Sequence, residues 1–355
     1  MSTRRVLCSG CFLATALATL LVTASAAQER ESAQKGLEQA WSLEGTWTGV
    51  VGDEGKGAIY AIGRAGQCVE LDLAGKQRRE IKVPEDKSPV LRIARFRGAV
   101  GTVLLTFSPW GEELRAYDLS GKQLWNYPGG SGIDDAWAGD LNNDGSDEVI
   151  VGYNGDTGLH VLDGTGKLLW KSTAIGNVWH VCAGDVLGEG KPQVVTTSAE
   201  GKVHLFDGGG KQRKDLDAGC YATMVRVGKL AEKDKAALIV VGGSALGGGN
   251  QKGEILAGLS GQGVKKWSLE LPGGRLGINS AQLAPGKPWL AVGTGGLLGG
   301  QVHIVDIEKG EIIASAKGQG MSPEVGWADG KGPGAPLLLV ATGSKLNAFR
   351  VAKGK

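Results

Sequence analysis

Charge imbalance, cysteine and long internal apolar runs are all scarce in this sequence of 355 residues. Lys and Arg total 39 against 37 Asp and Glu, so charge gives no reason to expect nucleic acid or an anionic membrane surface as a partner. After residue 26 no segment reaches the roughly 18 consecutive apolar residues that span a bilayer, so no integral membrane segment is expected in the mature chain. Three cysteines remain there, and we expect them to be buried thiols with no catalytic role: Cys68, Cys182 and Cys220.

The beginning of the sequence has the pattern of an export signal. Two arginines precede an apolar run over 6–22, and small residues up to Ala26 offer a cleavage site. We therefore predict a signal peptide over 1–26, a linker over 27–36 and a mature protein in the periplasm or outside the cell. A membrane anchor is the alternative, but the apolar run is short for a bilayer and ends in small residues.

Glycine, with 61 residues, is far above its usual share and follows no collagen period, which indicates many tight turns between short strands. One pattern recurs: short apolar strands, a third strand that ends in Asp, a Gly-Lys turn and a fourth strand that often carries Trp. The residue that ends the third strand returns at intervals of 44 to 51 residues, at Asp72, Asp118, Asp163, Asp207, Gly258, Asp306 and Arg350. Since no segment shows a sustained helical period, the sequence predicts an all-β fold, a seven-bladed β-propeller of four-stranded antiparallel blades over 37–351.

The last repeat is one strand short, and the missing strand is found at the other end of the predicted domain. Residues 36–43 match the fourth strand of another repeat, at 263–269. We therefore expect the N-terminal strand to complete the last blade, which closes the ring and covers an edge that would otherwise be exposed.

A column of tryptophans occupies the fourth strand of four repeats, at Trp41, Trp125, Trp170 and Trp267. Large aromatic side chains at this place pack between neighbouring blades, and a stacking platform for sugars is the alternative. The segment 116–125 resembles the tryptophan-docking repeat of pyrroloquinoline-quinone-type propellers. That resemblance is architectural, and because the sequence has no adjacent cysteine pair we do not expect the quinone.

The most specific motif is the acidic segment 140–148. It has oxygen donors at positions 1, 3, 5 and 9 and Gly at position 6, which lets a tight loop surround a hard cation. The segment resembles the calcium loop of the FG-GAP/VCBS repeat family of secreted bacterial and integrin-type propellers, and the resemblance implies one structural calcium. Its ligands would be Asp140, Asn142, Asp144, the Ser146 carbonyl and Glu148. Glu at position 9 departs from the more usual Asp, and a turn without metal is the alternative.

Polar residues near the start of the predicted innermost strands are candidates for a ligand site at the mouth of the central channel. We expect the following to surround it: Asp134, Asp135, Trp179, His180, Tyr221, Arg275, Asn279 and Glu324. Polar side chains that merely line a wet channel are the alternative. Three other histidines, His160, His204 and His303, share one repeat position, and we expect them to pack or hydrogen-bond between blades.

The sequence predicts a secreted or periplasmic calcium-binding propeller that binds a protein or a carbohydrate without catalysing a reaction. The alternative is a carbohydrate-active enzyme, such as a polysaccharide lyase, with its site at the channel mouth. Some propeller lyases, such as ulvan lyases, use His with Tyr and Arg, and His160, His180, Tyr221 and Arg226 invite that comparison. The catalytic candidates are His180, Asp135, Tyr221 and Arg226.

Overall fold

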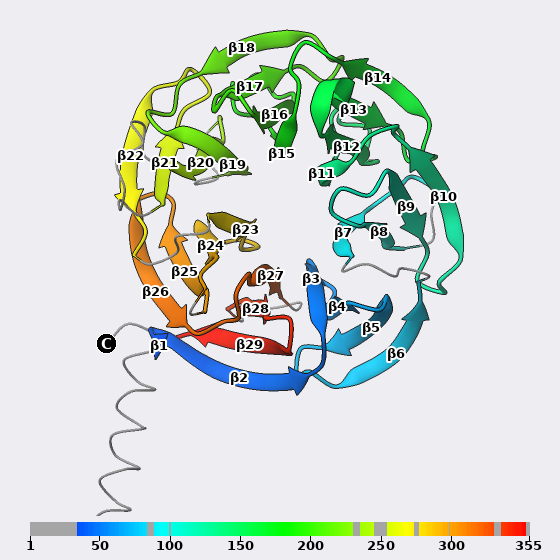
Figure 1. Ribbon diagram of the computed structural model, residues 1–355, viewed down its shortest axis with the longest axis vertical. Helices are drawn as coiled ribbons and strands as arrows, with labels where there is room; N and C mark the ends of the chain where they lie inside the picture. The colour runs from blue at the N-terminus through cyan, green and yellow to red at the C-terminus, as the bar shows by residue number, and fades with distance from the viewer. Residues whose placement is uncertain are drawn as a thin grey trace, which may run out of the picture.

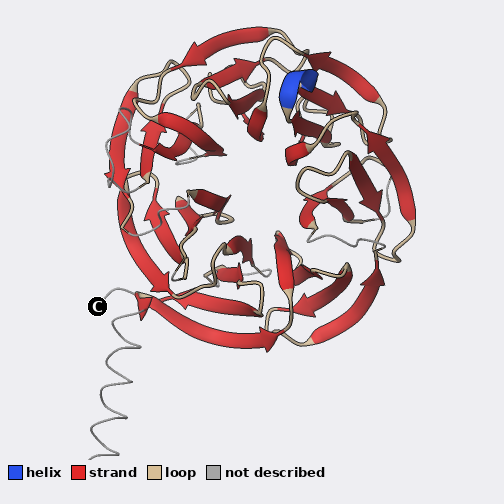
Figure 2. Cartoon of the chain, in the orientation of Figure 1, coloured by secondary structure: helices blue, strands red, loops and turns tan. Residues whose placement is uncertain are grey.

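The structure is a computed structural model that describes residues 34–83, 89–98, 101–229, 235–244, 254–272, 277–297, 299–329 and 335–352. Seven antiparallel sheets are arranged as a ring of blades around a central axis (Figure 1). Figure 2 shows strands almost throughout, with one 3-10 turn, η1, at Gly155–Thr157. The predicted all-β propeller of seven four-stranded blades is confirmed, whereas the expected signal peptide over 1–26 lies outside the described residues.

The innermost strands surround the central axis (Figure 1). Most of them carry polar residues near the end at which they begin, and these residues form the site described below. The innermost strands are β3 (Trp47–Asp53), β7 (Val90–Ala94), β11 (Ile133–Gly139), β15 (Val178–Gly184), β19 (Tyr221–Gly228), β23 (Ile278–Leu283) and β27 (Glu324–Ala328).

The second strands are buried along almost their whole length because both of their faces pack against neighbouring blades. They are rich in Val, Ile and Leu, whose branched side chains suit a pleated, covered surface. These strands are β4 (Ala58–Gly63), β8 (Val103–Phe107), β12 (Glu148–Tyr153), β16 (Gln193–Ser198), β20 (Leu238–Ser244), β24 (Trp289–Thr294) and β28 (Leu337–Ala341). Each buried Val, Leu or Ile contributes roughly 1.5–3 kcal/mol.

The third strands complete the cores between blades. One such core joins Leu114 and Ala116 of the third strand of one blade to Val149 and Val151 of the next blade. The hydrophobic effect therefore stabilises the contact between neighbouring blades as well as the packing within each blade. The third strands are β5 (Gln67–Asp72), β9 (Glu113–Tyr117), β13 (Leu159–Leu162), β17 (Val203–Phe206), β21 (Ile255–Leu259), β25 (Gln301–Asp306) and β29 (Lys345–Val351).

The outermost strands face solvent on one side and the next blade on the other. They are β6 (Gln77–Lys82), β10 (Gln123–Pro128), β14 (Leu168–Ser172), β18 (Gln212–Leu216), β22 (Lys265–Glu270), β26 (Glu311–Lys317) and β2 (Leu37–Glu44). The Trp125 indole donates to Gly164 O of the next blade at 3.1 Å. Its ring covers Gly166, where the φ of 82° favours glycine and a Cβ would lie 2.7 Å from the ring.

The tryptophan column makes the same contact in the other three blades. The indoles of Trp41, Trp170 and Trp267 donate to backbone carbonyl groups of the next blade at 2.8 to 2.9 Å. These side chains join blades, as the packing interpretation of the sequence predicts.

The two ends of the ring meet in one blade. β2 pairs antiparallel with β29, from Leu37 opposite Val351 to Glu44 opposite Lys345. The predicted closure of the last blade by the N-terminal strand is therefore confirmed, and Figure 1 shows β2 along the outside of β29. Two residues of the expected linker form an additional strand, β1 (Gln34–Lys35), which pairs with β26.

The three cysteines are buried and unpaired, as expected. Burial raises the pKa of the Cys68 and Cys182 thiols to about 12, so both are protonated at neutral pH. Across the described part of the chain, no helix has the length and apolar character needed to cross a bilayer.

Candidate functional site

A network of charged side chains lies at the central axis and is centred on Asp135 of β11. Its carboxylate lies 3.1 Å from Arg92 of β7, 3.1 Å from His180 Nδ1 of β15 and 3.5 Å from Arg226 of β19. Arg92 also pairs with Glu324 of β27 at 3.4 Å. The charged network, as we name these five residues, thus connects five of the seven blades.

The charged network keeps Asp135 ionised although the residue is only 2% exposed. Burial alone would raise its pKa, but the hydrogen bond with His180 and the charges of Arg226 and Arg92 hold the pKa well below its usual range. Burial raises the pKa of Glu324, and the charges of Arg92 and Arg226 oppose this rise. Two arginines therefore compensate two carboxylates in a poorly hydrated place.

Arg226 is held from several sides. Its Nε donates to Ala281 O at 2.8 Å, its Nη1 donates to Val225 O at 2.8 Å, and its guanidinium lies 4.9 Å from the centre of the Trp137 ring. With 2% exposure it has no free face for a ligand. Its position supports a role in orienting Asp135 rather than in contacting a substrate.

A cavity of about 550 Å³ opens on the face where the innermost strands begin. We name it the mouth cavity. Residues at the starts of six innermost strands line it: Thr48, Val90, Asp134, His180, Asn279 and Glu324. Arg64, Phe107, Pro109, Met321 and Thr342 are among its further wall residues. Its size and its mixed polar and apolar walls are typical of small-ligand pockets.

Unpartnered polar atoms concentrate around the mouth cavity. Among the described residues, five buried side-chain nitrogen or oxygen atoms have no hydrogen-bond partner, and four of the five belong to residues that line this cavity. The four are Trp47 Nε1, Arg92 Nε, Asp134 Oδ2 and Asn279 Nδ2. Because an unsatisfied buried polar group costs about 1–3 kcal/mol, such a concentration marks a place where a polar ligand or water completes the bonding.

The structure brings most of the predicted mouth residues together. Asp134, Asp135, His180, Asn279 and Glu324 all line the mouth cavity. Burial raises the pKa of Asp134, and the nearby Trp110 side chain, the charge of His180 and the Asn154 side chain oppose this rise.

Two of the residues predicted at the mouth do not line the mouth cavity and pack on each other, and a third predicted residue cannot be placed. The rings of Trp179 and Tyr221 are 5.9 Å apart, and the Tyr221 hydroxyl donates to Ala199 O at 2.6 Å. Arg275 lies outside the described residues. Of the four catalytic candidates, the structure therefore joins Asp135, His180 and Arg226 and engages Tyr221 elsewhere.

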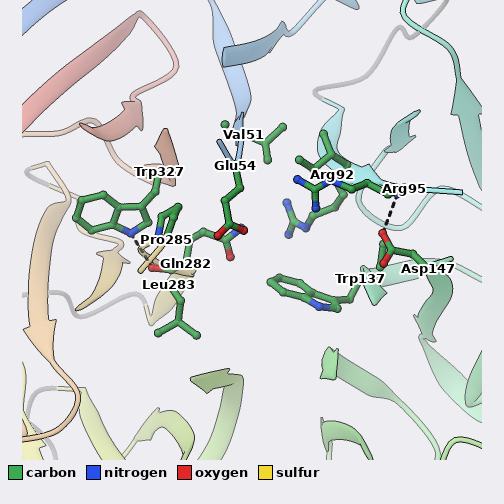
Figure 3. Close-up of a pocket in the computed structure, with 13 residues that line it drawn as sticks. Val51, Glu54, Arg92, Arg95, Trp137, Asp147, Gln282, Leu283, Pro285 and Trp327 are labelled. Atoms are coloured by element: carbon green, nitrogen blue, oxygen red, sulfur yellow. Dashed lines mark hydrogen bonds between the residues drawn. The ribbon is translucent and has the colours of Figure 1, made fainter. Parts of the chain in front are cut away.

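A second cavity, of about 280 Å³, lies where the innermost strands end, and we name it the opposite cavity (Figure 3). Trp327 lies on one side of it and Trp137 and Arg95 lie on the other, with Glu54 between the two sides (Figure 3). Arg92 lines both cavities, and a space of only about 10 Å³ beside Arg92 and Arg226 shares walls with each. The charged network thus lies between two separate sites rather than in one open tunnel.

The acidic loop 140–148 joins β11 to β12. Its side chains bind its own backbone: Asp140 accepts from Asp144 N at 3.1 Å and from Gly145 N at 2.8 Å, and Glu148 accepts from Leu141 N at 2.8 Å. Burial raises the pKa of Glu148, and the charges of Asp144 and Asp140 raise it further. A cation would relieve this repulsion, so the donor chemistry fits calcium.

The described residues contain no group of three or more His, Cys, Asp or Glu side chains placed to hold a metal ion. Asn142 Nδ2 donates to Glu148 Oε1 at 3.0 Å, and Asn142 Oδ1 accepts from Asp144 N at 2.8 Å. Ser146 Oγ accepts from Arg97 N at 3.0 Å, which leaves its carbonyl as the expected ligand. Calcium binding therefore requires these side chains to turn inward, and the calcium site stays a prediction.

The three histidines of the shared repeat position are buried in the blades. His160 Nδ1 lies 3.0 Å from the Tyr127 hydroxyl and His303 Nε2 lies 3.2 Å from Pro272 O, both in the preceding blade. His303 Nδ1 lies 2.9 Å from Ser315 Oγ of its own blade. Neither residue lines the mouth cavity. These contacts agree with the expected hydrogen-bonding role and separate His160 from the lyase comparison.

His204 lies in a Ser-His-Asp arrangement. Its Nε2 is 2.9 Å from Ser198 Oγ, and its Nδ1 is 2.8 Å from Asp215 Oδ1. A hydrolase needs its serine open to the substrate, whereas Ser198 is 0% exposed and its Oγ already accepts from Glu200 N at 3.3 Å. The arrangement therefore links three strands of one blade and is closed to substrates.

The sequence analysis missed three residues around the mouth cavity: Arg92, Trp47 and Trp110. Arg92 had a signal, because a charged residue interrupts the apolar run 91–93 of an expected innermost strand. In the sequence, Trp47 cannot be distinguished from a tryptophan of the hydrophobic core. Only the structure shows that its Nε1 has no hydrogen-bond partner.

Comparisons with known proteins agree with the fold. The family model described as the lambda-carrageenase beta-propeller domain matches residues 108–244, which is less than half of the chain. No curated protein matches the sequence. A crystal structure of BBS1N in complex with ARL6DN, soaked with lead, is similar with a TM-score of 0.61 and 12% sequence identity. The match covers 91% of this chain and 99% of that one, and at this identity it shows the propeller fold alone.

Proposed function

We propose that this propeller is a carbohydrate-binding module whose ligand occupies the mouth cavity. The observation that carries the proposal is the group of unpartnered polar atoms there, three donors and one acceptor on Trp47, Arg92, Asn279 and Asp134. Sugar hydroxyl groups both donate and accept, so one saccharide can satisfy such a mixed set. The apolar wall residues Phe107, Pro109 and Met321 suit the C–H faces of a sugar ring.

The family match supports a polysaccharide as the source of that saccharide. The enzyme named in the family description acts on lambda-carrageenan, and the matched stretch 108–244 contains Asp134, Asp135 and His180 of the mouth cavity. We therefore expect the ligand to be a segment of a polysaccharide chain.

Calorimetry with a panel of neutral and acidic oligosaccharides, carrageenan fragments included, tests the proposal. Asn279→Ala and Asp134→Ala each remove a partner of the ligand, and each should weaken binding by about tenfold or more. Each variant should affect binding more than the free energy of unfolding, because Asp134 Oδ2 and Asn279 Nδ2 have no hydrogen-bond partner in the protein. Asn126→Ala, at an exposed position of β10, is the matched control and should bind as the wild type does. Absence of binding across the panel would overturn the proposal.

A polysaccharide lyase is the second candidate, favoured by the pairing of His180 with a buried carboxylate. Asp135 binds His180 Nδ1, which leaves Nε2 to act as a base. His180 would take the proton from the carbon next to the carboxylate of a uronic acid, and the electron pair of that C–H bond would form a carbon–carbon double bond. The neighbouring glycosidic C–O bond would break, and its oxygen would leave with the electrons of that bond and take a proton from water. Ultraviolet absorbance of the unsaturated product, present with the wild type and absent with His180→Gln, would favour this function.

The same proposal includes export and one structural calcium, both of which rest on the sequence. The resemblance to FG-GAP/VCBS propellers and the apolar run over 6–22 support a periplasmic or extracellular protein. In the acidic loop, Asp140, Asn142, Asp144, the Ser146 carbonyl and Glu148 would hold the ion. Calcium would neutralise the loop and fix its conformation.

A further inference from the structure

Trp110 differs from every other tryptophan of the protein. All ten tryptophans lie within the described residues, and nine of them are buried or half-buried. Trp110 is 76% exposed. It belongs to the connection between β8 and β9, on the same face as the mouth cavity, and its neighbour Pro109 lines that cavity.

The backbone at Trp110 is strained. Gly111 N donates to Ser108 O at 2.8 Å, which makes 108–111 a turn with Pro109 at its second position. The φ of Trp110 is 61°, and in this pattern of turn the third position is normally Gly or Asn. A large aromatic residue in the left-handed region costs free energy unless its surroundings impose the conformation.

The surroundings do impose it. Trp110 N donates to Ile133 O at 2.9 Å, and Ile133 N donates back to Gly111 O at 2.9 Å. Gly132 lies against the same turn, since a Cβ there would be 3.1 Å from Trp110 Cα. The turn is thus fixed to the start of β11, which holds in one place the strained backbone that carries the exposed indole.

That place is next to Asp134. Trp110 N donates to Ile133 O, of the residue before Asp134, and the Trp110 side chain lies near enough to the Asp134 carboxylate to oppose the rise in its pKa that burial causes. Asp134 lines the mouth cavity, and its Oδ2 has no hydrogen-bond partner. An aromatic face beside a free carboxylate oxygen is suited to a sugar ring, because the ring packs on the indole while a hydroxyl group donates to the carboxylate.

We infer that Trp110 is a stacking platform for one sugar ring of a polysaccharide chain, and that Asp134 accepts a hydroxyl hydrogen of the same ring. The inference rests on the proposed function and extends it, because it places a second ring outside the cavity and so makes the ligand a chain. The strain is retained because the turn holds the indole toward solvent, where a ligand can cover it.

Trp110→Gly provides a test in which stability and binding change in opposite directions. Glycine suits the positive φ, so the melting temperature should stay the same or rise, whereas affinity for the bound oligosaccharide should fall by about tenfold or more. Trp110→Phe keeps an aromatic face and should retain most of the affinity. Leu169→Ala, which removes another exposed apolar side chain on β14, should alter neither property.

The outcomes separate this inference from the proposed function. If Asn279→Ala abolishes binding and Trp110→Gly does not, the cavity binds sugar and the platform is wrong. If the wild type binds no saccharide, both the proposed function and the inference about Trp110 are wrong. Fluorescence gives an independent readout: the ligand should protect an exposed tryptophan from iodide quenching in the wild type and have no such effect in Trp110→Gly, and equal protection in both would overturn the inference.

Discussion

Two neighbouring blades, β11–β14 and β15–β18, have the same backbone and different chemistry. Asp140 in the first and Asp185 in the second begin the loop between the two inner strands, and each accepts from the backbone N–H groups four and five residues further on, at 2.7 to 3.1 Å. The second loop makes this turn with Leu187 where the first has Asn142. One Asp therefore suffices for the shape of the loop, so the further oxygen-bearing side chains of the first loop are not needed for that shape.

The innermost strands of the same two blades show the difference in another way. Asp135 and His180 occupy the same repeat position, next to an irregularity in the pairing of β11 with β12 and of β15 with β16. The two residues bind each other at 3.1 Å. Divergence between repeats thus places an acid and a base side by side, which identical repeats cannot do.

The largest expected effect separates these two positions. Asp135→Ala leaves Arg92 and Arg226 without their shared carboxylate, and the free energy of unfolding should fall by about 3–5 kcal/mol. His180→Ala removes a half-buried partner and should cost about 1 kcal/mol. Urea denaturation measures both, and equal losses would mean that Asp135 is not the centre of the network.

Calcium should distinguish the two loops. At a calcium concentration about 100-fold above Kd, a bound ion stabilises the folded state by about 2.7 kcal/mol. Calorimetry should show binding by the wild type and by Glu189→Ala in the second loop, but none by Asp144→Ala in the first. Equal heats from the wild type and Asp144→Ala would remove the ion from the loop 140–148.

A smaller effect should appear with pH at the shared histidine position. Burial, together with the charge of Lys171, lowers the pKa of His160 from 6.5, whereas His204 in the next blade has Asp215 as its partner. Because His160 then binds a proton more readily in the unfolded chain than in the folded protein, acid favours unfolding. The contribution of His160 to the free energy of unfolding is therefore complete above pH 6.5 and is lost as the pH falls below that value. Lys171→Asp, which copies the second blade, should reduce the loss.

Melting temperatures over roughly pH 5 to 8 measure this effect. His160→Gln is the control that removes the titration at this position. A pH dependence unchanged by either substitution would show that His160 does not contribute to the acid sensitivity.

The fold could be predicted because the residues that mark it act locally. Asp118 and Asp163 recur because each carboxylate accepts backbone N–H groups two and four residues later, at 2.8 to 3.0 Å, and so fixes the turn before the outermost strand. Trp41 and Trp125 recur because each joins its blade to the next. Such roles repeat with every blade and are therefore visible as a period.

The site could be predicted only in part, because it is formed where the repeats differ. Asp134, His180 and Asn279 could be placed at the mouth from their position at the start of innermost strands. The pairing of Arg92 with Glu324 joins residues 232 positions apart in the sequence and has no period. The exposed position of Trp110 goes with the positive φ of its backbone, and the spacing of residues in the sequence repeat does not predict the sign of φ.

The closure of the ring has a consequence for the order of folding. Ser42 Oγ of β2 donates to Asn347 Oδ1 of β29 at 2.8 Å, across 305 positions of sequence. While β29 is still inside the ribosome, β2 has no partner strand and the last blade cannot form, so closure must follow synthesis of the whole ring. Contacts at such separation form slowly, and this junction is where we expect the rate of assembly to be decided.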